Sequence, residues 1–179
     1  MKIVIVGGVA GGATTAARLR RLDENAEIIL FERGNHISFA NCGLPYYIGD
    51  VIKEKEELLL QTPKSFKKRF NIEVRVKQEV IKLKREDKKV EVQNKENGEI
   101  YEETYDKLVL APGAEPMNPF PKSTKIKTLR NVEDAVGIKK YINENRPKEI
   151  TIIGGGYIGV ELAENLSKEK DLRLKILER

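Results

Sequence analysis

The start of the chain alternates between apolar runs and runs of small or polar residues in a regular order. Residues 3–6 form a continuous apolar run, residues 7–12 are rich in glycine, and residues 13–22 have the apolar spacing of a helix. A second apolar run follows at residues 28–32 and ends in an acid. This order predicts a buried parallel strand, a tight turn, a crossover helix and a second strand.

The same order returns near the other end of the sequence. Residues 150–153 are apolar, residues 154–159 form a second glycine turn, residues 160–166 have helical spacing, and residues 174–178 form another apolar run that ends in an acid. Such an internal repeat predicts two copies of one strand–turn–helix–strand unit.

The spacing of glycines and acids indicates that each unit binds a dinucleotide. The first glycine permits the bend, the second lets the backbone approach a pyrophosphate, and the third lets the helix pack on the sheet. The helix N-terminus favours the negative charge, and the acid accepts hydrogen bonds from a ribose. Glu32 lies 20 residues beyond Gly12, and Glu178 lies 19 beyond Gly159. The first copy has Val9 at the middle position, and a turn without a ligand is the alternative for both copies.

The region between the two units predicts further strands and a helix. Three loosely alternating segments, residues 79–83, 88–93 and 100–104, indicate a β-meander. Residues 105–113 predict a buried strand that ends in a small-residue turn, and residues 131–145 predict a helix, with Arg146 and Pro147 as its break.

Composition narrows the classes of protein that fit. Hydrophobic residues make up 40% and charged residues 34% of the 179 positions, and the net charge is +5. Lysine and glutamate are interspersed, so we expect a mixed surface and no nucleic-acid partner. No run approaches the length of a membrane helix, and residues 1–6 read as a strand and not as a signal, so we expect a cytoplasmic protein. With only His36 and Cys42 as soft ligands, we expect no metal site.

The single cysteine lies in an unusual segment, residues 38–49, which reads Ser-Phe-Ala-Asn-Cys-Gly-Leu-Pro-Tyr-Tyr-Ile-Gly. One interpretation is a small buried cysteine in a hydrophobic turn. The other is a redox group, because we expect Cys42 to open a short helix, whose N-terminus would stabilise a thiolate.

Three segments together resemble a known family. Gly-Gly-Val-Ala-Gly-Gly at residues 7–12, the cysteine segment and Gly-Gly-Gly-Tyr-Ile-Gly at residues 154–159 resemble the single-cysteine pyridine nucleotide-disulfide oxidoreductases, in particular the coenzyme A disulfide and persulfide reductases. The resemblance covers the whole chain. It implies an α/β fold, in which a Rossmann-like FAD-binding domain with a β-meander precedes the start of a Rossmann-like NAD(P)-binding domain.

The resemblance also implies a function. It implies an FAD-dependent enzyme that uses NADH or NADPH to reduce coenzyme A disulfide or persulfide through Cys42, as a homodimer. An NADH oxidase that reduces oxygen and a non-catalytic flavin- or nucleotide-binding module are the alternatives. We expect residues 1–115 in the FAD domain, 116–147 in a connecting segment and 148–179 in a truncated NAD(P) domain, so the chain is expected to be a fragment of the enzyme.

Site residues follow from the same resemblance. The expected cofactor-binding residues are Gly7, Gly8, Val9, Ala10, Gly11, Gly12, Glu32, Arg33, Asn41, Val80, Ala111, Pro112, Gly113, Gly154, Gly156, Tyr157, Ile158, Gly159 and Glu178. The expected substrate-binding residues are Thr14, Arg18, Arg21, Ser38, Asn41 and Cys42, and Cys42 is the expected catalytic residue. Thr14, Arg18 and Arg21 are spaced to share one helix face, where arginine suits a phosphate; a solvated basic face is the alternative.

Two positions depart from the family, and two more leave the choice of nicotinamide cofactor open. A lysine that contacts coenzyme A in some members falls at Phe70, and the histidine that peroxidases and oxidases of the family carry in the first turn is replaced by Ala10. At the second unit, Glu178 favours NADH, whereas Arg179 could pair with the 2′-phosphate of NADPH. Because Glu178 matches Glu32 in register, we expect a modest preference for NADH.

Overall fold

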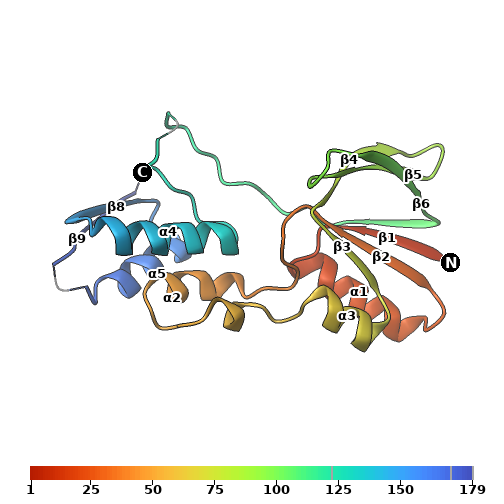
Figure 1. Cartoon of the computed structure of the whole chain (residues 1–179), viewed down its shortest axis with the longest axis horizontal. Coiled ribbons are helices and arrows are strands. Elements are labelled where there is room, and N and C mark those ends of the chain that lie inside the picture. Colours follow the sequence, from red (N-terminus) through yellow and green to blue (C-terminus); the bar gives the residue numbers. More distant parts are fainter. Residues whose placement is uncertain (122, 170, 179) are drawn as a thin grey trace. The chain divides into compact units, whose positions relative to one another are not determined.

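The computed structural model describes residues 1–121, 123–169 and 171–178. Its contacts divide the chain into two units, which we describe one at a time (Figure 1). The first unit consists of Met1–Phe39 and Leu59–Ala114, and the second of Ala40–Leu58 and Glu115–Arg179.

The first unit is built on a four-stranded parallel sheet. Its strands, in spatial order, are β3 (Glu73–Val76), β2 (Glu27–Glu32), β1 (Lys2–Val6) and β7 (Lys107–Leu110). Val4 of the central strand pairs with Ile29 on one side and Leu108 on the other. The carboxyl ends of β1, β2 and β7 therefore meet at one edge of the sheet.

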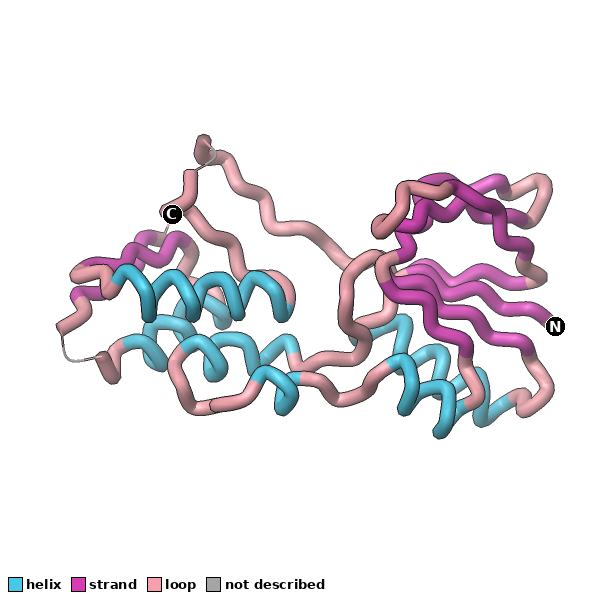
Figure 2. Tube along the Cα trace, in the orientation of Figure 1, coloured by secondary structure: helices cyan, strands magenta, loops and turns pink. Residues whose placement is uncertain are grey.

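Both faces of this sheet are covered, which explains the continuous apolar runs. Helices α1 (Ala10–Leu22) and α3 (Pro63–Phe70) lie on one face, where Ile3, Ile5, Leu30 and Phe66 are buried together. The antiparallel meander of β4 (Gln78–Lys84), β5 (Lys89–Asn94) and β6 (Ile100–Thr104) covers the other face. Val4, Ile29, Phe31, Val90 and Val92 form the core there. Figure 2 shows the helices and the meander on opposite sides of the sheet.

An ion-pair network joins the meander to the parallel sheet. Glu103 accepts hydrogen bonds from Lys2 Nζ at 2.5 Å and from Arg75 Nη1 at 2.7 Å, and the Arg75 guanidinium lies 5.3 Å from the Phe31 ring centroid. Burial of Glu103 raises its pKa, but the bonds from Lys2 and Arg75 outweigh that effect, so the pKa lies below its ordinary value.

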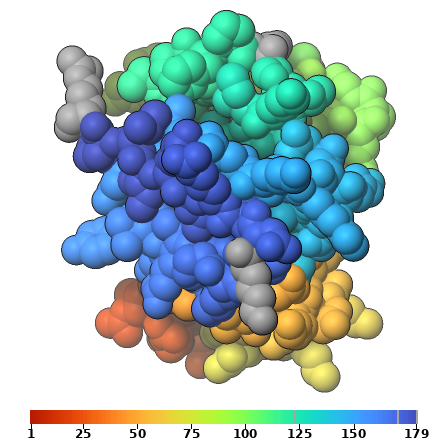
Figure 3. All heavy atoms as spheres, turned by 90° about the vertical axis from the view of Figure 1, so that its left-hand side faces the viewer, coloured from red at the N-terminus to blue at the C-terminus, as the bar shows by residue number. Residues whose placement is uncertain are grey.

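The second unit holds the remaining elements. They are the 3-10 turns η1 (Asn41–Gly43) and η2 (Lys55–Leu58), helices α2 (Leu44–Ile48), α4 (Val132–Asn145) and α5 (Tyr157–Leu166), and strands β8 (Glu149–Ile153) and β9 (Arg173–Leu177). The two strands pair in parallel. Asn131 and Asp134 form a capping box at the start of α4, and Arg146 ends the helix in the left-handed region, at φ +42°. Figure 3 looks onto atoms of this unit. Ile153, Ile158 and Leu177 of this unit are exposed.

Most of the expected elements are confirmed, with shifted bounds. Both crossover helices begin earlier than expected, at Ala10 and Tyr157, so the last glycine of each turn lies inside its helix. Strand β9 ends at Leu177, one residue before Glu178. The sequence reading missed α3 and β3, although Thr62 caps α3 and Pro63 begins it, which is a recognisable start signal.

Candidate functional site

The first glycine turn leaves no room for side chains at its two ends. Gly7 has φ +97°, and a Cβ there would lie 2.0 Å from the Ala111 carbonyl oxygen. A Cβ on Gly12 would lie 1.7 Å from the Gly7 carbonyl oxygen. Glycine at both positions therefore lets α1 and the loop after β7 close on the turn, as a dinucleotide-binding turn requires.

Glu32, the last residue of β2, stabilises this turn by hydrogen bonds. Its Oε2 accepts a hydrogen bond from the Gly8 amide at 2.7 Å, and its Oε1 accepts one from the Gly34 amide at 2.7 Å. The residue is 8% exposed. A carboxylate has about four lone-pair sites, so each oxygen can still accept another bond, such as one from a ribose hydroxyl.

The N-terminus of α1 is free to attract an anion. Val9 at its cap makes no side-chain hydrogen bond to the helix, and its first turn contains no acidic residue. The positive end of the helix dipole is thus not neutralised by a side chain within the helix.

The second glycine turn repeats these features in the second unit. Gly154 has φ +109°, and a Cβ on Gly159 would lie 2.1 Å from the Gly154 carbonyl oxygen. The Gly155 amide donates to the carboxylate of Glu178, as Gly8 does to Glu32. Here the acid is exposed, and the residues around Gly156 are exposed as well. Arg179, the competing residue for cofactor preference, lies outside the described residues.

The other residues of the first unit that are expected to contact flavin lie in a loop, on the surface and at the edge of the core. Ala111 donates its amide to the Val6 carbonyl at 2.8 Å, so the loop with Pro112 and Gly113 begins beside the first glycine turn. Arg33 is exposed and lies 3.9 Å from Glu79. Val80 packs against the core under the meander.

The expected substrate face of α1 is exposed. Thr14, Arg18 and Arg21 are all exposed, which fits either a phosphate site or a solvated face. Arg20 between them has a different role, because its guanidinium donates to five backbone carbonyls, three that follow α1 and two at the end of α3. Arg20 is therefore a structural residue, and the two neighbouring arginines are available for another partner.

Ser38, another expected substrate position, is held by backbone hydrogen bonds. Ser38 has φ +46°, donates its amide to the Gly8 carbonyl at 3.0 Å and accepts at its carbonyl from the Leu60 amide at 3.0 Å. At Phe70, where the resemblance leads one to expect a lysine, the ring centroid lies 5.0 Å from that of Phe66. Phe70 thus contributes to packing and supplies no charge.

The cysteine lies at the start of a helical segment, as expected. Cys42 is in the turn η1, directly before α2, and it is exposed. The interpretation of a buried structural cysteine is therefore wrong for this unit.

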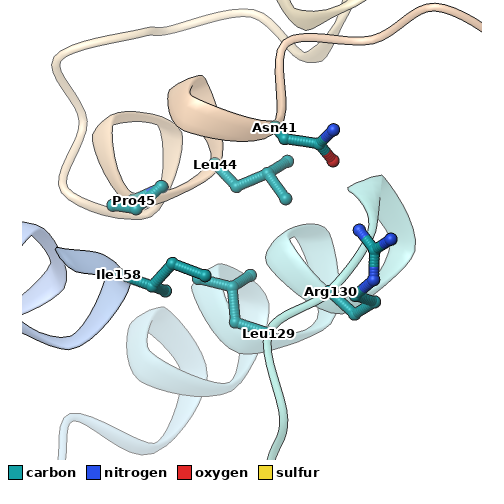
Figure 4. A pocket seen from close by; sticks show the side chains of 6 residues that line it. All are labelled: Asn41, Leu44, Pro45, Leu129, Arg130 and Ile158. Atoms are coloured by element: carbon teal, nitrogen blue, oxygen red, sulfur yellow. The ribbon is translucent and has the colours of Figure 1, made fainter. Parts of the chain in front are cut away.

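A small cavity of about 50 Å³ lies in the second unit next to the cysteine segment (Figure 4). Leu44, Pro45, Leu129 and Ile158 form apolar walls, while Asn41 and Arg130 supply polar groups. The side-chain oxygen of Asn41 is buried and has no hydrogen-bond partner among the described residues. The cavity can therefore accept a hydrogen bond at Asn41 and donate one from Arg130.

The sequence reading named only part of this cavity. It assigned Asn41 and Ile158 to cofactor or substrate, but it missed Leu129 and Arg130. Neither belongs to a motif; the only nearby signal is Asn131, which caps α4 and so fixes where Arg130 stands.

The described residues contain neither a candidate metal cluster nor a candidate membrane span. No group of three or more His, Cys, Asp or Glu side chains within it could hold a metal ion. None of its helices has the length and hydrophobicity needed to span a membrane.

The chain is similar to a known protein family and to curated proteins over most of its length. The family model "Pyridine nucleotide-disulphide oxidoreductase" matches residues 1–179. A coenzyme A disulfide reductase of Staphylococcus haemolyticus is 45% identical over 165 residues, which cover 92% of this chain and 38% of that protein. The chain therefore spans about two fifths of the length of this curated relative.

Two solved structures are similar in fold and sequence. The reduced Bacillus anthracis CoADR-RHD has a TM-score of 0.94 and 52% identity, over 99% of this chain and 32% of that one. An NAD-dependent persulfide reductase from A. fulgidus has a TM-score of 0.89 and 34% identity, over 98% of this chain and 34% of that one.

Proposed function

The chain belongs to the pyridine nucleotide-disulphide oxidoreductase family, and from this we propose that it is part of an FAD- and NAD(P)H-dependent reductase of coenzyme A disulfide or persulfide. The observation that carries the proposal is the combination of two glycine turns, each fastened by an acid, with an exposed Cys42 as the only cysteine. The similar coenzyme A disulfide reductase and persulfide reductase support the choice of substrate.

The residues of the first unit fit a flavin dinucleotide. Gly7 and Gly12 bring backbone to the position of a pyrophosphate, and the uncapped end of α1 would attract its charge. Glu32 would accept the ribose hydroxyls, while Arg33, Val80 and the loop of Ala111 to Gly113 would contact the rest of the cofactor.

The residues of the second unit fit a nicotinamide dinucleotide in the same way. Gly154, Gly156 and Gly159 would approach its pyrophosphate, and Glu178 would accept its ribose hydroxyls. Tyr157 and Ile158 open helix α5 and would contact the cofactor there. The carboxylate of Glu178 favours NADH, because it would repel a 2′-phosphate.

We assign the disulfide chemistry to Cys42. Its thiolate attacks one sulfur of coenzyme A disulfide, so that a mixed disulfide forms and one coenzyme A thiolate leaves. When bound, NADH and FAD supply the two electrons that reduce the mixed disulfide, which releases the second coenzyme A and restores the thiolate. Overall, two electrons and two protons convert one disulfide to two thiols. Asn41 directly precedes the cysteine and would hold the substrate there, and Ser38 stays a proposed substrate contact of the first unit.

The phosphates of coenzyme A would bind along α1. Arg18 and Arg21 are exposed on one helix face with Thr14, and arginine binds phosphate oxygens in pairs. Each alanine variant should raise KM for coenzyme A disulfide and leave the reduction of flavin by NADH unchanged. An equal effect on a small disulfide without phosphates would show that the arginines are structural.

Steady-state turnover of the whole protein tests the proposed function. Coenzyme A disulfide, coenzyme A persulfide, oxygen and peroxide are compared as acceptors, and we expect the first two to be reduced much faster. The Cys42→Ser variant should lose this activity by orders of magnitude, and full activity would reject the role of Cys42. Faster consumption of oxygen would favour an NADH oxidase, and bound flavin or nucleotide without turnover would favour a non-catalytic binding module. A homodimer and a cytoplasmic location stay predictions, which light scattering and cell fractionation can check.

A further inference from the structure

The segment that carries Cys42 is supported by elements that come much later in the sequence. Ala40–Leu58 belongs to the same unit as residues from Glu115 onward, and α2 contacts both α4 and α5. Helix α2 has only five residues. A helix of that length is not stable on its own, so its geometry depends on its tertiary contacts.

Lys139 of α4 makes two contacts with the end of α2. Its Nζ lies 2.9 Å from Asp50 Oδ1 and 4.0 Å from the centroid of the Tyr47 ring. The side chain of Lys139 is 13% exposed and that of Asp50 is 47% exposed, so water screens the ion pair from the Asp50 side, while the ammonium group itself is largely enclosed. The cation therefore holds a carboxylate and an aromatic face at the same time.

The backbone at Asp50 needs such support. Asp50 has φ +61°, a left-handed conformation that costs free energy in a residue other than glycine. The chain turns back at this residue, and its amide donates to the Tyr47 carbonyl at 3.3 Å. The ion pair with Lys139 favours the strained turn over its alternatives.

Helix α5 supports the same end of α2 from another side. A Cβ on Gly49 would lie 2.5 Å from Asn165 Cβ and 3.0 Å from the Asn165 carbonyl oxygen. Asn165 is 2% exposed, so it has no free space into which to withdraw. Glycine at position 49 thus permits a close contact between α2 and α5.

We propose that Lys139 is a positioning residue for Cys42: by fixing the end of α2 on α4, it holds the cysteine segment in the conformation that reacts with the disulfide. Lys139 acts through Tyr47 and Asp50 and not by contact with the reacting sulfur. The redox role of Cys42 in this statement rests on the proposed function, whereas the mechanical support of α2 does not.

The first experiment measures support without activity. Amide hydrogen exchange is followed in residues 41–50 of the whole protein, for Lys139→Met and for Lys140→Met as the matched control. Lys140 is the next residue on α4, and it pairs with Glu144 of the same helix at 3.7 Å. We expect exchange to rise about tenfold in Lys139→Met, to stay unchanged in Lys140→Met, and to return toward the parent rate in Lys139→Arg, which keeps the charge and the cation–π contact. Equal exchange in the Met variants overturns the proposal.

A second variant tests the same contact from the other side. Asp50→Asn removes the charge but tolerates the left-handed backbone. If Lys139 acts through Asp50, the effects of Lys139→Met and Asp50→Asn on exchange should be less than additive in the double variant. Full additivity would show that the pair does not act as a unit.

The third measurement connects support to chemistry. In Lys139→Met, kcat/KM for coenzyme A disulfide should fall about tenfold, while the rate of flavin reduction by NADH stays unchanged. Loss of both half-reactions together, or of neither, overturns the positioning role. Full activity of Cys42→Ser would instead reject the proposed function, and the exchange result would distinguish the two failures.

Discussion

Replacing Glu32 by glutamine changes a single oxygen to an amide nitrogen in a buried site. The parent carboxylate accepts from Gly8 and Gly34, each at 2.7 Å. An amide has one acceptor oxygen, so in Glu32→Gln one backbone N–H must face an NH₂ donor. A hydrogen bond to a charged group contributes about 1.5–3 kcal/mol, and an unsatisfied buried donor costs about 1–3 kcal/mol. We therefore expect the variant to lose about 2–3 kcal/mol of unfolding free energy, mainly in the first unit.

Urea denaturation and thermal melting measure this loss. For a chain of this size, 2 kcal/mol corresponds to a decrease in Tm of about 4–8 °C. Glu178→Gln is the control, because Glu178 makes the same bond to its own turn from an exposed position. Its effect should be below about 1 kcal/mol. Equal losses in the two variants, or an unchanged Tm in Glu32→Gln, would refute the reasoning that burial of the carboxylate sets the magnitude.

Three other predictions follow from the same geometry. Because the pKa of Glu103 is lowered in the folded state, its ion pairs stabilise the fold at neutral pH. This stabilisation is lost as pH falls below about 5 and through the lowered pKa. Glu103→Gln should therefore reduce the decrease in unfolding free energy that is measured at acid pH. Gly7→Ala should lower the unfolding free energy by at least about 3 kcal/mol in a denaturation experiment, because φ is +97° and a carbonyl occupies the space of the Cβ. Gly137→Ala should raise it by about 0.5–1 kcal/mol, because Gly137 lies in helix α4 and its Cβ would meet nothing within 4 Å. Glu178→Ala should lower kcat/KM for NADH about tenfold and affect NADPH less; a parent enzyme that prefers NADPH would contradict the assignment of the ribose to Glu178.

The sequence alone predicts those features of the fold that depend on the spacing of nearby residues. The two glycine turns and their acids were predicted because backbone geometry and residue order determine them: Gly7 and Gly154 both have positive φ, and Glu32 and Glu178 both bond to the residue after that glycine. The bond itself was not predicted, because the expectation gave these carboxylates to a ribose alone.

Contacts between distant segments could not be read in the same way. Nothing in the residues around Tyr47 and Asp50 indicates that Lys139 covers them, and nothing around Gly49 indicates Asn165. Arg130 likewise reaches the cavity beside Asn41 only because α4 packs near α2. Such partners are selected by packing between segments that lie far apart in the sequence, which periodicity does not encode.

The residues on either side of Ala40–Leu58 are paired with each other in the first unit. Phe39 and Leu59 form an antiparallel bridge, and the Leu60 amide donates to the Ser38 carbonyl at 3.0 Å. The two ends of the nineteen-residue excursion Ala40–Leu58 are thus already joined as the legs of a hairpin are. A two-residue type I′ loop such as Asn-Gly could replace the excursion and leave the parallel sheet and its first glycine turn intact. Excision at these neighbouring ends would remove Cys42 and leave a first unit that keeps Gly7, Gly12 and Glu32, a thiol-free starting point for protein design.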